Sequence, residues 1–230
     1  GGGINSNSAI SLETANLKTL PLGRIFKDEK NVQQHFFFDD EDGRASYATF
    51  LATFRNNPNW QIIDKENYII IKSKSGKEVE VYANKPDTEY AGQDDIKALF
   101  KETKRWPDVV VHRGHSYFAS AAIESLTPYV EIVFLGSCGG YNNISQVLKY
   151  SPNAQIISSK QIGTMLVNNE LCLQLNEVIR KGQDIVWDNL WVQLNKEFTK
   201  GSIASERFQD YIPPHKNLGA LLIKTYREML

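Results

Sequence analysis

Short apolar runs alternate with helical patterns throughout the second half of the chain, and few folds satisfy that order of elements. The apolar runs cover residues 109–111, 131–135 and 154–158, and helical spacing fills the segments between them. Buried strands that alternate with helices through short links are typical of βαβ units, whose strands lie parallel between two layers of helices. The sequence therefore predicts an α/β fold, a three-layer sandwich with a mostly parallel sheet.

The first half of the chain supplies further elements of this fold. The apolar run 35–38 predicts a buried strand that ends in the acidic turn 39–42, and residues 44–56 have helical spacing. Residues 60–83 contain apolar or alternating runs separated by a Ser-Gly turn, which predicts strands with an inserted β-hairpin. Residues 1–20 are polar and weakly patterned. We expect a flexible arm or linker there, and a single α/β domain with a helical C-terminal extension over 21–230.

Two consecutive predicted strands end in side chains suited to nucleophilic catalysis. The first leads into His112–His115 and the second into Gly136–Gly139. Consecutive parallel strands are usually neighbours, and their functional residues lie at the carboxyl ends, so we expect His115 and Cys138 to lie close together. In such a pair the thiolate attacks a carbonyl carbon while the imidazole carries its proton. The sequence therefore predicts a Cys–His dyad at one edge of the sheet.

These motifs resemble those of the caspase-like clan of cysteine peptidases, which includes caspases, gingipains, clostripains and separases. The resemblance rests on Arg113–Ser116, a Gly-His turn after a strand, and on Gly136–Gly139, a small residue, Cys and Gly after the next strand. It spans about 36–182 and is sharpest over 109–163. The resemblance implies a caspase-like form of the fold, hydrolysis of peptide bonds in a peptide or protein substrate, and chemistry that needs no cofactor.

The resemblance also assigns roles within the two motifs. Cys138 would be the nucleophile and His115 the general acid and base. The backbone N–H groups of Cys138 and Gly139 are placed by the turn to hold the oxyanion. In the clan, the N–H of the residue after the His also contributes, and here that residue is Ser116 where most members have Gly.

Three alternatives stay open at the level of the sequence. His112 competes with His115 as the base; His115 is preferred because it follows Gly114 directly and lies farther toward the loop, which leaves His112 and Gly114 as supporting residues. A buried Cys after a strand is often only a small hydrophobic residue, and we expect this role for Cys172 inside a helical pattern. The chain could also be an inactive caspase-like module that binds a peptide or protein, or another α/β thiol hydrolase or acyltransferase.

Members of this clan select the residue before the scissile bond with a charged or polar pocket. Asp39 and Asp40 follow the first strand and would pair with a basic substrate side chain. Arg44 would instead receive an acidic side chain, and Ser159 and Lys160 are expected to form a pocket wall after the strand that follows the Cys strand. We favour a basic substrate residue, although the acidic turn suits the solvated start of a helix equally well.

Composition limits the remaining classes. The net charge of −1 gives no overall attraction to nucleic acid or to a membrane. No apolar stretch approaches the ~20 residues that span a bilayer, and residues 1–8 lack the basic start and apolar core of a signal peptide. The histidines and cysteines show no metal-ligand spacing. We expect a soluble protein without a nucleic-acid, membrane or metal partner. The compartment stays undecided, and the chain could belong to a longer multidomain protein.

Overall fold

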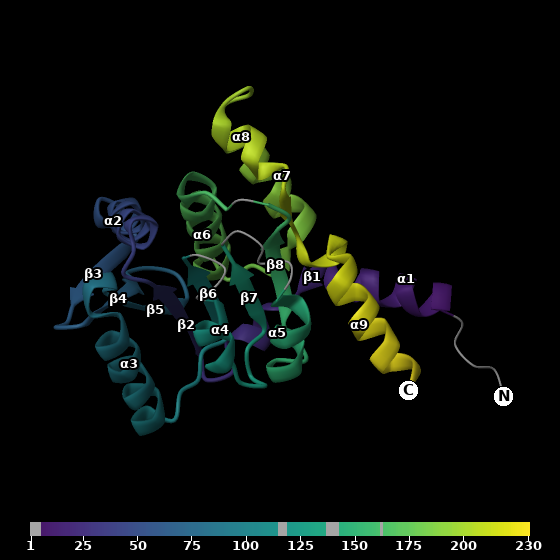
Figure 1. Ribbon diagram of the computed structural model, residues 1–230, viewed down its shortest axis with the longest axis horizontal. Helices are drawn as coiled ribbons and strands as arrows, with labels where there is room; N and C mark the ends of the chain where they lie inside the picture. The colour runs from purple at the N-terminus through teal and green to yellow at the C-terminus, as the bar shows by residue number, and fades with distance from the viewer. Residues whose placement is uncertain (1–5, 115–118, 137–142, 162) are drawn as a thin grey trace.

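The computed structural model describes residues 6–114, 119–136, 143–161 and 163–230. Within them, eight strands form one mixed sheet in the order β10-β8-β7-β6-β2-β5-β4-β3 (Figure 1). The five parallel strands are β2 (Lys30–Phe37), β5 (Glu78–Asn84), β6 (Val109–Arg113), β7 (Ile132–Leu135) and β8 (Gln155–Ser159). The antiparallel strands are β3 (Trp60–Asp64), β4 (Tyr68–Ser73) and β10 (Tyr211–Ile212). The predicted α/β class and mostly parallel sheet are therefore confirmed.

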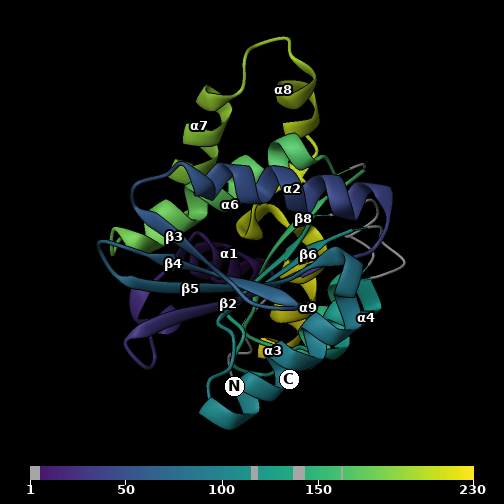
Figure 2. The same cartoon turned by 90° about the vertical axis from the view of Figure 1, so that its left-hand side faces the viewer.

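Helices cover both faces of the sheet, as Figure 2 shows. The helices of one face include α2 (Glu41–Arg55) and α6 (Met165–Arg180), and those of the other include α3 (Glu89–Thr103), α4 (Ala119–Glu124) and α5 (Ile144–Tyr150). Successive residues of a strand point to opposite faces, so Phe37 joins the core beneath α2 and α6 while Phe36 and Phe38 join the core beneath α4 and α5. The strands of the parallel centre are buried on both sides, which explains their continuous apolar runs.

The middle of the chain forms an antiparallel extension of the sheet. Strands β4 and β5 make the expected hairpin around the Ser-Gly turn, with Ile71 opposite Val81, and β3 pairs with β4 on the outer side, with Ile62 opposite Ile71. The C-terminal part adds α7 (Trp187–Glu197), α8 (Ile203–Phe208) and α9 (Leu218–Met229), and β1 (Thr19–Leu20) pairs with β9 (Ile185–Val186). In the described ranges, short 3₁₀ segments lie at Leu22–Ile25, Pro86–Thr88 and Pro214–Lys216. Among the described helices, none has the length and apolar character needed to cross a membrane.

The structure differs from expectation at the N-terminus. Residues 6–17, expected within a flexible arm, form helix α1 (Ser6–Leu17), which packs against α9. Ala9 and Leu17 are buried in the structure. The apolar surface that α1 covers is supplied by a helix at the far end of the chain, so the local pattern gives little sign of it.

Strand β2 also begins earlier than the apolar run at 35–38. Its first half is polar in sequence but buried, because its amides satisfy one another: the Gln33 side chain donates to Asn31 at 2.9 Å and to Asn176 at 2.6 Å. The ring of His35 contacts the Gln33 oxygen at 3.0 Å. Buried amides that are fully paired are tolerated inside a sheet, whereas a pattern of apolar residues does not reveal them.

Candidate active site at the carboxyl edge of the sheet

The two strands that precede the predicted dyad are parallel neighbours. Residues of β6 and β7 pair in register from Val109 with Ile132 to His112 with Leu135. The pairing continues one step further, because the N–H of Gly136 donates to the carbonyl oxygen of His112 at 3.1 Å. The chain therefore leaves both strands at the same edge of the sheet.

The predicted dyad and oxyanion residues themselves lie outside the described residues. These are His115, Ser116, Cys138 and Gly139. On the histidine side the described chain reaches Gly114, and on the cysteine side it reaches Gly136. A Cβ atom at Gly114 would lie 2.7 Å from Cδ2 of Phe38, so only glycine fits there without a shift of that ring.

The strand order makes this edge a natural place for a ligand. The parallel strands lie in the order β5-β2-β6-β7-β8, so the chain first builds outward from β2 to β5 and then turns back to add β6, β7 and β8 on the other side. The reversal falls between β2 and β6. In doubly wound sheets, ligands bind outside the carboxyl ends of the strands at such a reversal.

Two consecutive asparagines at the start of α6 connect the ends of β6 and β7. Asn168 is buried, and its side-chain amide donates to the carbonyl oxygen of Gly136 at 2.8 Å. Asn169 accepts a hydrogen bond from the guanidinium of Arg113 at 2.6 Å and donates to the hydroxyl of Thr49 on α2 at 2.8 Å. One turn of helix thus holds both strand ends, two residues before each member of the predicted dyad.

Arg113 is a residue of this edge that the sequence reading did not assign. Its side chain is only 1% exposed, and its guanidinium carbon lies 5.3 Å from the ring centre of Phe37 and 5.7 Å from that of Phe50. No described carboxylate forms an ion pair with it, and burial lowers the pKa of its guanidinium. A buried cation that rests on aromatic faces, one amide and the Cys172 thiol depends strongly on those contacts.

Replacing Asn169 with alanine is expected to destabilise the protein by about 2–3 kcal/mol, because a buried charged donor loses its acceptor. Urea unfolding gives the free energy. The matched control makes the same Asn169→Ala substitution in an Arg113→Met background, where no guanidinium donates to Asn169. There the loss in free energy of unfolding should fall below about 1 kcal/mol. Equal costs in the two backgrounds would show that Arg113 and Asn169 are not coupled.

His112, the alternative base, is a fully buried residue of β6. Its ring centre lies 5.1 Å from that of Phe38, on the face covered by α4 and α5. The other described histidines are also committed to contacts. Burial and the charge of Arg113 lower the pKa of His35 to about 3, so its ring is neutral, and His215 pairs with Asp188 at 2.9 Å.

Cys172 is the thiol that the structure describes. It lies on α6, is buried, and has a pKa raised to about 11 by burial, which the nearby Arg113 offsets only in part. The thiol therefore stays protonated at neutral pH and is a poor nucleophile. This agrees with its expected role as a core residue. No group of three potential metal ligands occurs among the described His, Cys, Asp and Glu residues.

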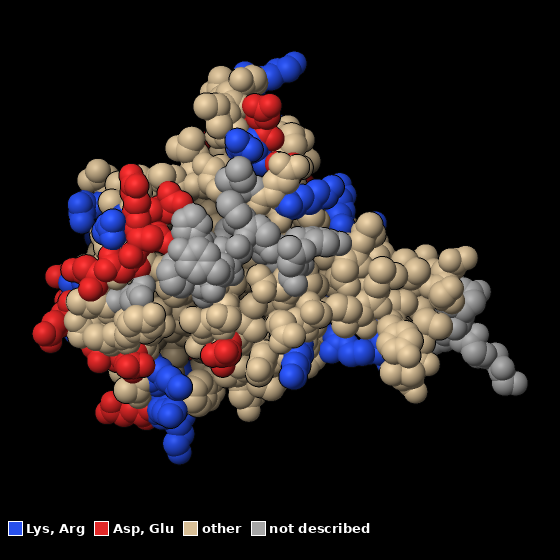
Figure 3. Space-filling model, viewed as in Figure 1, with Lys and Arg blue, Asp and Glu red and all other residues tan. Residues whose placement is uncertain are grey.

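The acidic candidates for the specificity pocket lie where α2 begins. The helix starts at Glu41, earlier than expected, because Asp40 caps it by accepting a hydrogen bond from the N–H of Gly43 at 2.6 Å. Asp39 and Arg44 form an ion pair at 2.7 Å, and both side chains are about half exposed. Figure 3 shows acidic side chains gathered over this side of the molecule. Asp40 therefore serves as a helix cap, the alternative that the sequence had left open.

Ser159 and Lys160 lie at the far side of β6 and β7 from the acidic start of α2. Strands β6 and β7 separate β8, which ends at Ser159, from β2. Ser159 is buried, and Lys160 is exposed and lines a hollow of about 470 Å³ together with Trp191 and Tyr211. The acidic and basic candidates thus do not form one cluster, but flank the strands β6 and β7 on opposite sides.

Comparison with known proteins identifies no family. No family model matches the chain, and no curated protein matches it. Among solved structures, the chain is similar to one described as the structure of Methanosarcina barkeri Roco2 RocCORdC bound to GDP. The two share 11% identity with a TM-score of 0.32, over 87% of this chain and 67% of that one. We draw nothing about fold or function from a similarity of this size.

Proposed function

We propose that this protein is a caspase-like cysteine peptidase in which Cys138 is the nucleophile and His115 the general acid and base. The observation that carries the proposal is the pairing of β6 with β7 as parallel neighbours with a common carboxyl edge. Helix α4 lies between them in the chain, so the order of strand, helix and strand within the resemblance agrees with the described elements. The reversal of strand order beside β6 adds independent support for a site here.

The chemistry follows from a thiol and an imidazole at such an edge. His115 takes the proton of the Cys138 thiol, and the thiolate attacks the carbonyl carbon of the scissile bond. The N–H groups of Cys138, Ser116 and Gly139 hold the resulting oxyanion. His115 then gives its proton to the leaving amine. Water, deprotonated by His115, hydrolyses the thioester and releases the free thiol, so the reaction needs no cofactor.

We propose a peptide or protein substrate with a basic side chain before the scissile bond. The acidic start of α2 supports this preference, because it lies at the carboxyl end of β2, directly beside β6. Asp40 is held as the helix cap, and Asp39 shares its charge with Arg44. A substrate guanidinium would therefore compete with Arg44 for Asp39, which makes the preference sensitive to position 44.

Active-site labelling tests the proposal directly. The native chain is treated with peptide chloromethyl ketones that carry Arg, Asp or Asn before the reactive group, and the modified cysteine is identified by mass spectrometry. We expect labelling of Cys138, fastest with the Arg reagent, and no labelling of Cys172, which serves as an internal control because its thiol is buried and protonated.

The outcomes separate the proposal from its alternatives. Failure of all three reagents to modify Cys138, with the same peptides still binding reversibly, would identify an inactive peptide-binding module. Equal labelling by all three reagents would support a thiol site but contradict the basic preference. Labelling by small acyl donors with no cleavage of peptides would favour another thiol hydrolase or acyltransferase.

A further inference from the structure

The opposite edge of the sheet, where β2, β6 and β7 begin, carries a hollow that the proposed hydrolysis does not use. Its volume is about 350 Å³, a size that suits a small molecule. Three parts of the chain build it: the entry to β2 supplies Lys27 and the first strand residue Lys30, the segment between α3 and β6 supplies Lys104–Trp106, and Tyr129 comes from the segment before β7.

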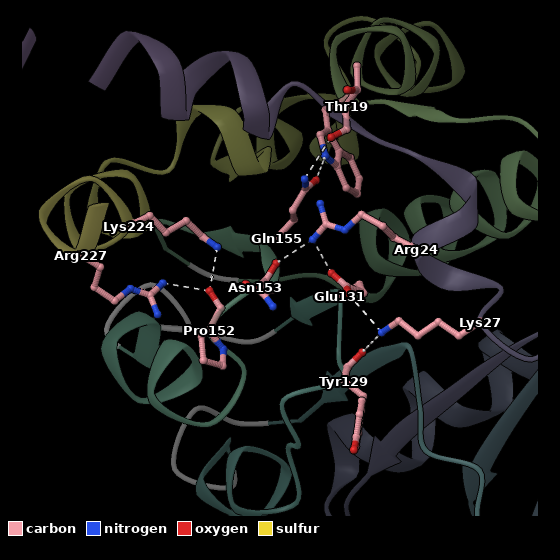
Figure 4. A network of polar contacts seen from close by, with 11 residues as sticks. Thr19, Arg24, Lys27, Tyr129, Glu131, Pro152, Asn153, Gln155, Lys224 and Arg227 are labelled. Atoms are coloured by element: carbon pink, nitrogen blue, oxygen red, sulfur yellow. Dashed lines mark hydrogen bonds and ion pairs between the residues drawn. The ribbon is translucent and has the colours of Figure 1, made fainter. Parts of the chain in front are cut away.

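Among the described residues, four cations and two acids line the hollow, and acids beside it pair with two of the cations. Lys27 is held by Glu131 at 3.2 Å and by the carbonyl oxygen of Tyr129 at 3.0 Å, as Figure 4 shows. Lys30 lies 3.2 Å from Glu80. In the part of the chain that the structure describes, the adjacent cations Lys104 and Arg105 have no such ion pair. Two neighbouring positive charges are therefore available to an anion.

The loops around the hollow hold unusual backbone conformations. Among the described residues, Glu29 (φ 63°) and Lys104 (φ 52°) are the two non-glycine residues with a positive φ, and both lie in these loops. A left-handed backbone costs a side-chain-bearing residue roughly 1 kcal/mol or more, and such costs concentrate at functional sites. Here Lys104 occupies the position after α3 where glycine is usual.

Two partly exposed aromatic rings line the same hollow. Trp106 is 38% exposed and Tyr129 is 55% exposed. Trp106 lies in the segment that leads into β6, and Tyr129 lies in the segment that leads into the neighbouring strand β7. Ring faces of this kind bind planar groups, while an arginine fork binds phosphate through two parallel hydrogen bonds.

We propose that this hollow binds a small planar molecule that carries a phosphate group, with Arg105 and Lys104 on the phosphate and Trp106 and Tyr129 on the ring. The inference is independent of the proposed peptidase activity.

Asp28 and Asp108 are the acids that line the hollow. Asp108 is buried, accepts a hydrogen bond from the N–H of Val32 at 3.0 Å, and opposes an anion when it is ionised. Burial raises its pKa to about 7, which weakens that opposition at neutral pH.

Binding of phenyl phosphate to the full chain tests the proposal. Calorimetry and tryptophan fluorescence report the affinity, and adenosine monophosphate is the second probe, which separates an aryl phosphate from a nucleotide as the source of the same chemistry. We expect dissociation constants below about 1 mM, a marked loss of affinity with added salt, and at least tenfold weaker binding for Arg105→Gln. Trp106→Phe should remove most of the fluorescence change but preserve the heat.

Matched variants make the result decisive. Lys101→Gln removes an exposed cation from α3 outside the hollow and should leave the affinity unchanged. Asp108→Asn removes an opposing charge and should tighten binding severalfold at pH 8.

If Arg105→Gln unfolds, which circular dichroism reveals, Lys104→Gln provides the same test. No binding of either probe up to about 10 mM, or equal binding by the Gln variants and the native chain, would overturn the proposal. Inorganic phosphate binding as tightly as phenyl phosphate would overturn the role of the rings.

Discussion

Replacing Cys138 with alanine is expected to lower the rate of peptide hydrolysis at least about a thousandfold, because the nucleophile is removed. His115→Ala should cause a loss of similar size. The double variant should be scarcely slower than either single variant, since a nucleophile and its base act as one unit. Cleavage of a fluorogenic peptide with a basic residue before the scissile bond measures kcat/KM. Additive losses would contradict a dyad.

The same assay distinguishes His115 from His112. His112 is fully buried against Phe38, so His112→Leu should lower the free energy of unfolding by about 1–3 kcal/mol while the folded fraction keeps its activity. The rate must be divided by the amount of folded protein, which near-ultraviolet circular dichroism gives. If His112→Leu abolishes the rate and His115→Ala preserves it, the base is His112.

The largest expected effect on stability comes from Gly43 in the first turn of α2. Glycine inside a helix normally costs about 1 kcal/mol relative to alanine, so Gly43→Ala would stabilise an isolated helix. Here the added Cβ would lie 1.8 Å from the carbonyl oxygen of Phe38 and 3.0 Å from Oδ1 of Asp40. The end of β2 and the start of α2 would have to separate. We expect a loss of about 3 kcal/mol, or roughly 10 °C in melting temperature.

A second glycine provides the control for this prediction. A Cβ added at Gly23 would meet nothing within 4 Å. Gly23→Ala should therefore change the melting temperature by no more than about 2 °C. A Gly43 variant as stable as the Gly23 variant would mean that the contact between Phe38 and α2 is looser than the structure indicates.

The parallel centre of the sheet could be predicted from the sequence because its strands are buried on both faces. Val109–Val111 and the runs that become β7 and β8 are continuous apolar segments, and that signal needs no knowledge of the rest of the chain. Strand β2 could be predicted only in part. Its buried residues Asn31 and Gln33 have polar side chains that are satisfied by each other and by Asn176 on α6, a residue far away in sequence.

The candidate site shows the same division. The proximity of the two motif strands could be predicted, since consecutive parallel strands tend to be neighbours. The connection of their ends through Asn168 and Asn169 could not, because an asparagine in a helical pattern gives no sign of its partner. Arg113 had one available signal, a charge two residues after a run of three buried valines, and this signal points to a buried cation only once α2 and α6 are known to cover it.

The antiparallel extension formed by β3, β4 and β5 has a consequence for how the chain folds. Its strands pair with their neighbours in sequence, so each pairing closes only a short loop. Every parallel pair instead joins segments separated by a crossover, and its loop must close before any contact is gained. The extension should therefore form early and offer the edge of β5 as a template for β2. Substitutions in β3 and β4 would then act on the folding rate, whereas substitutions in β8 would act chiefly on the rate of unfolding.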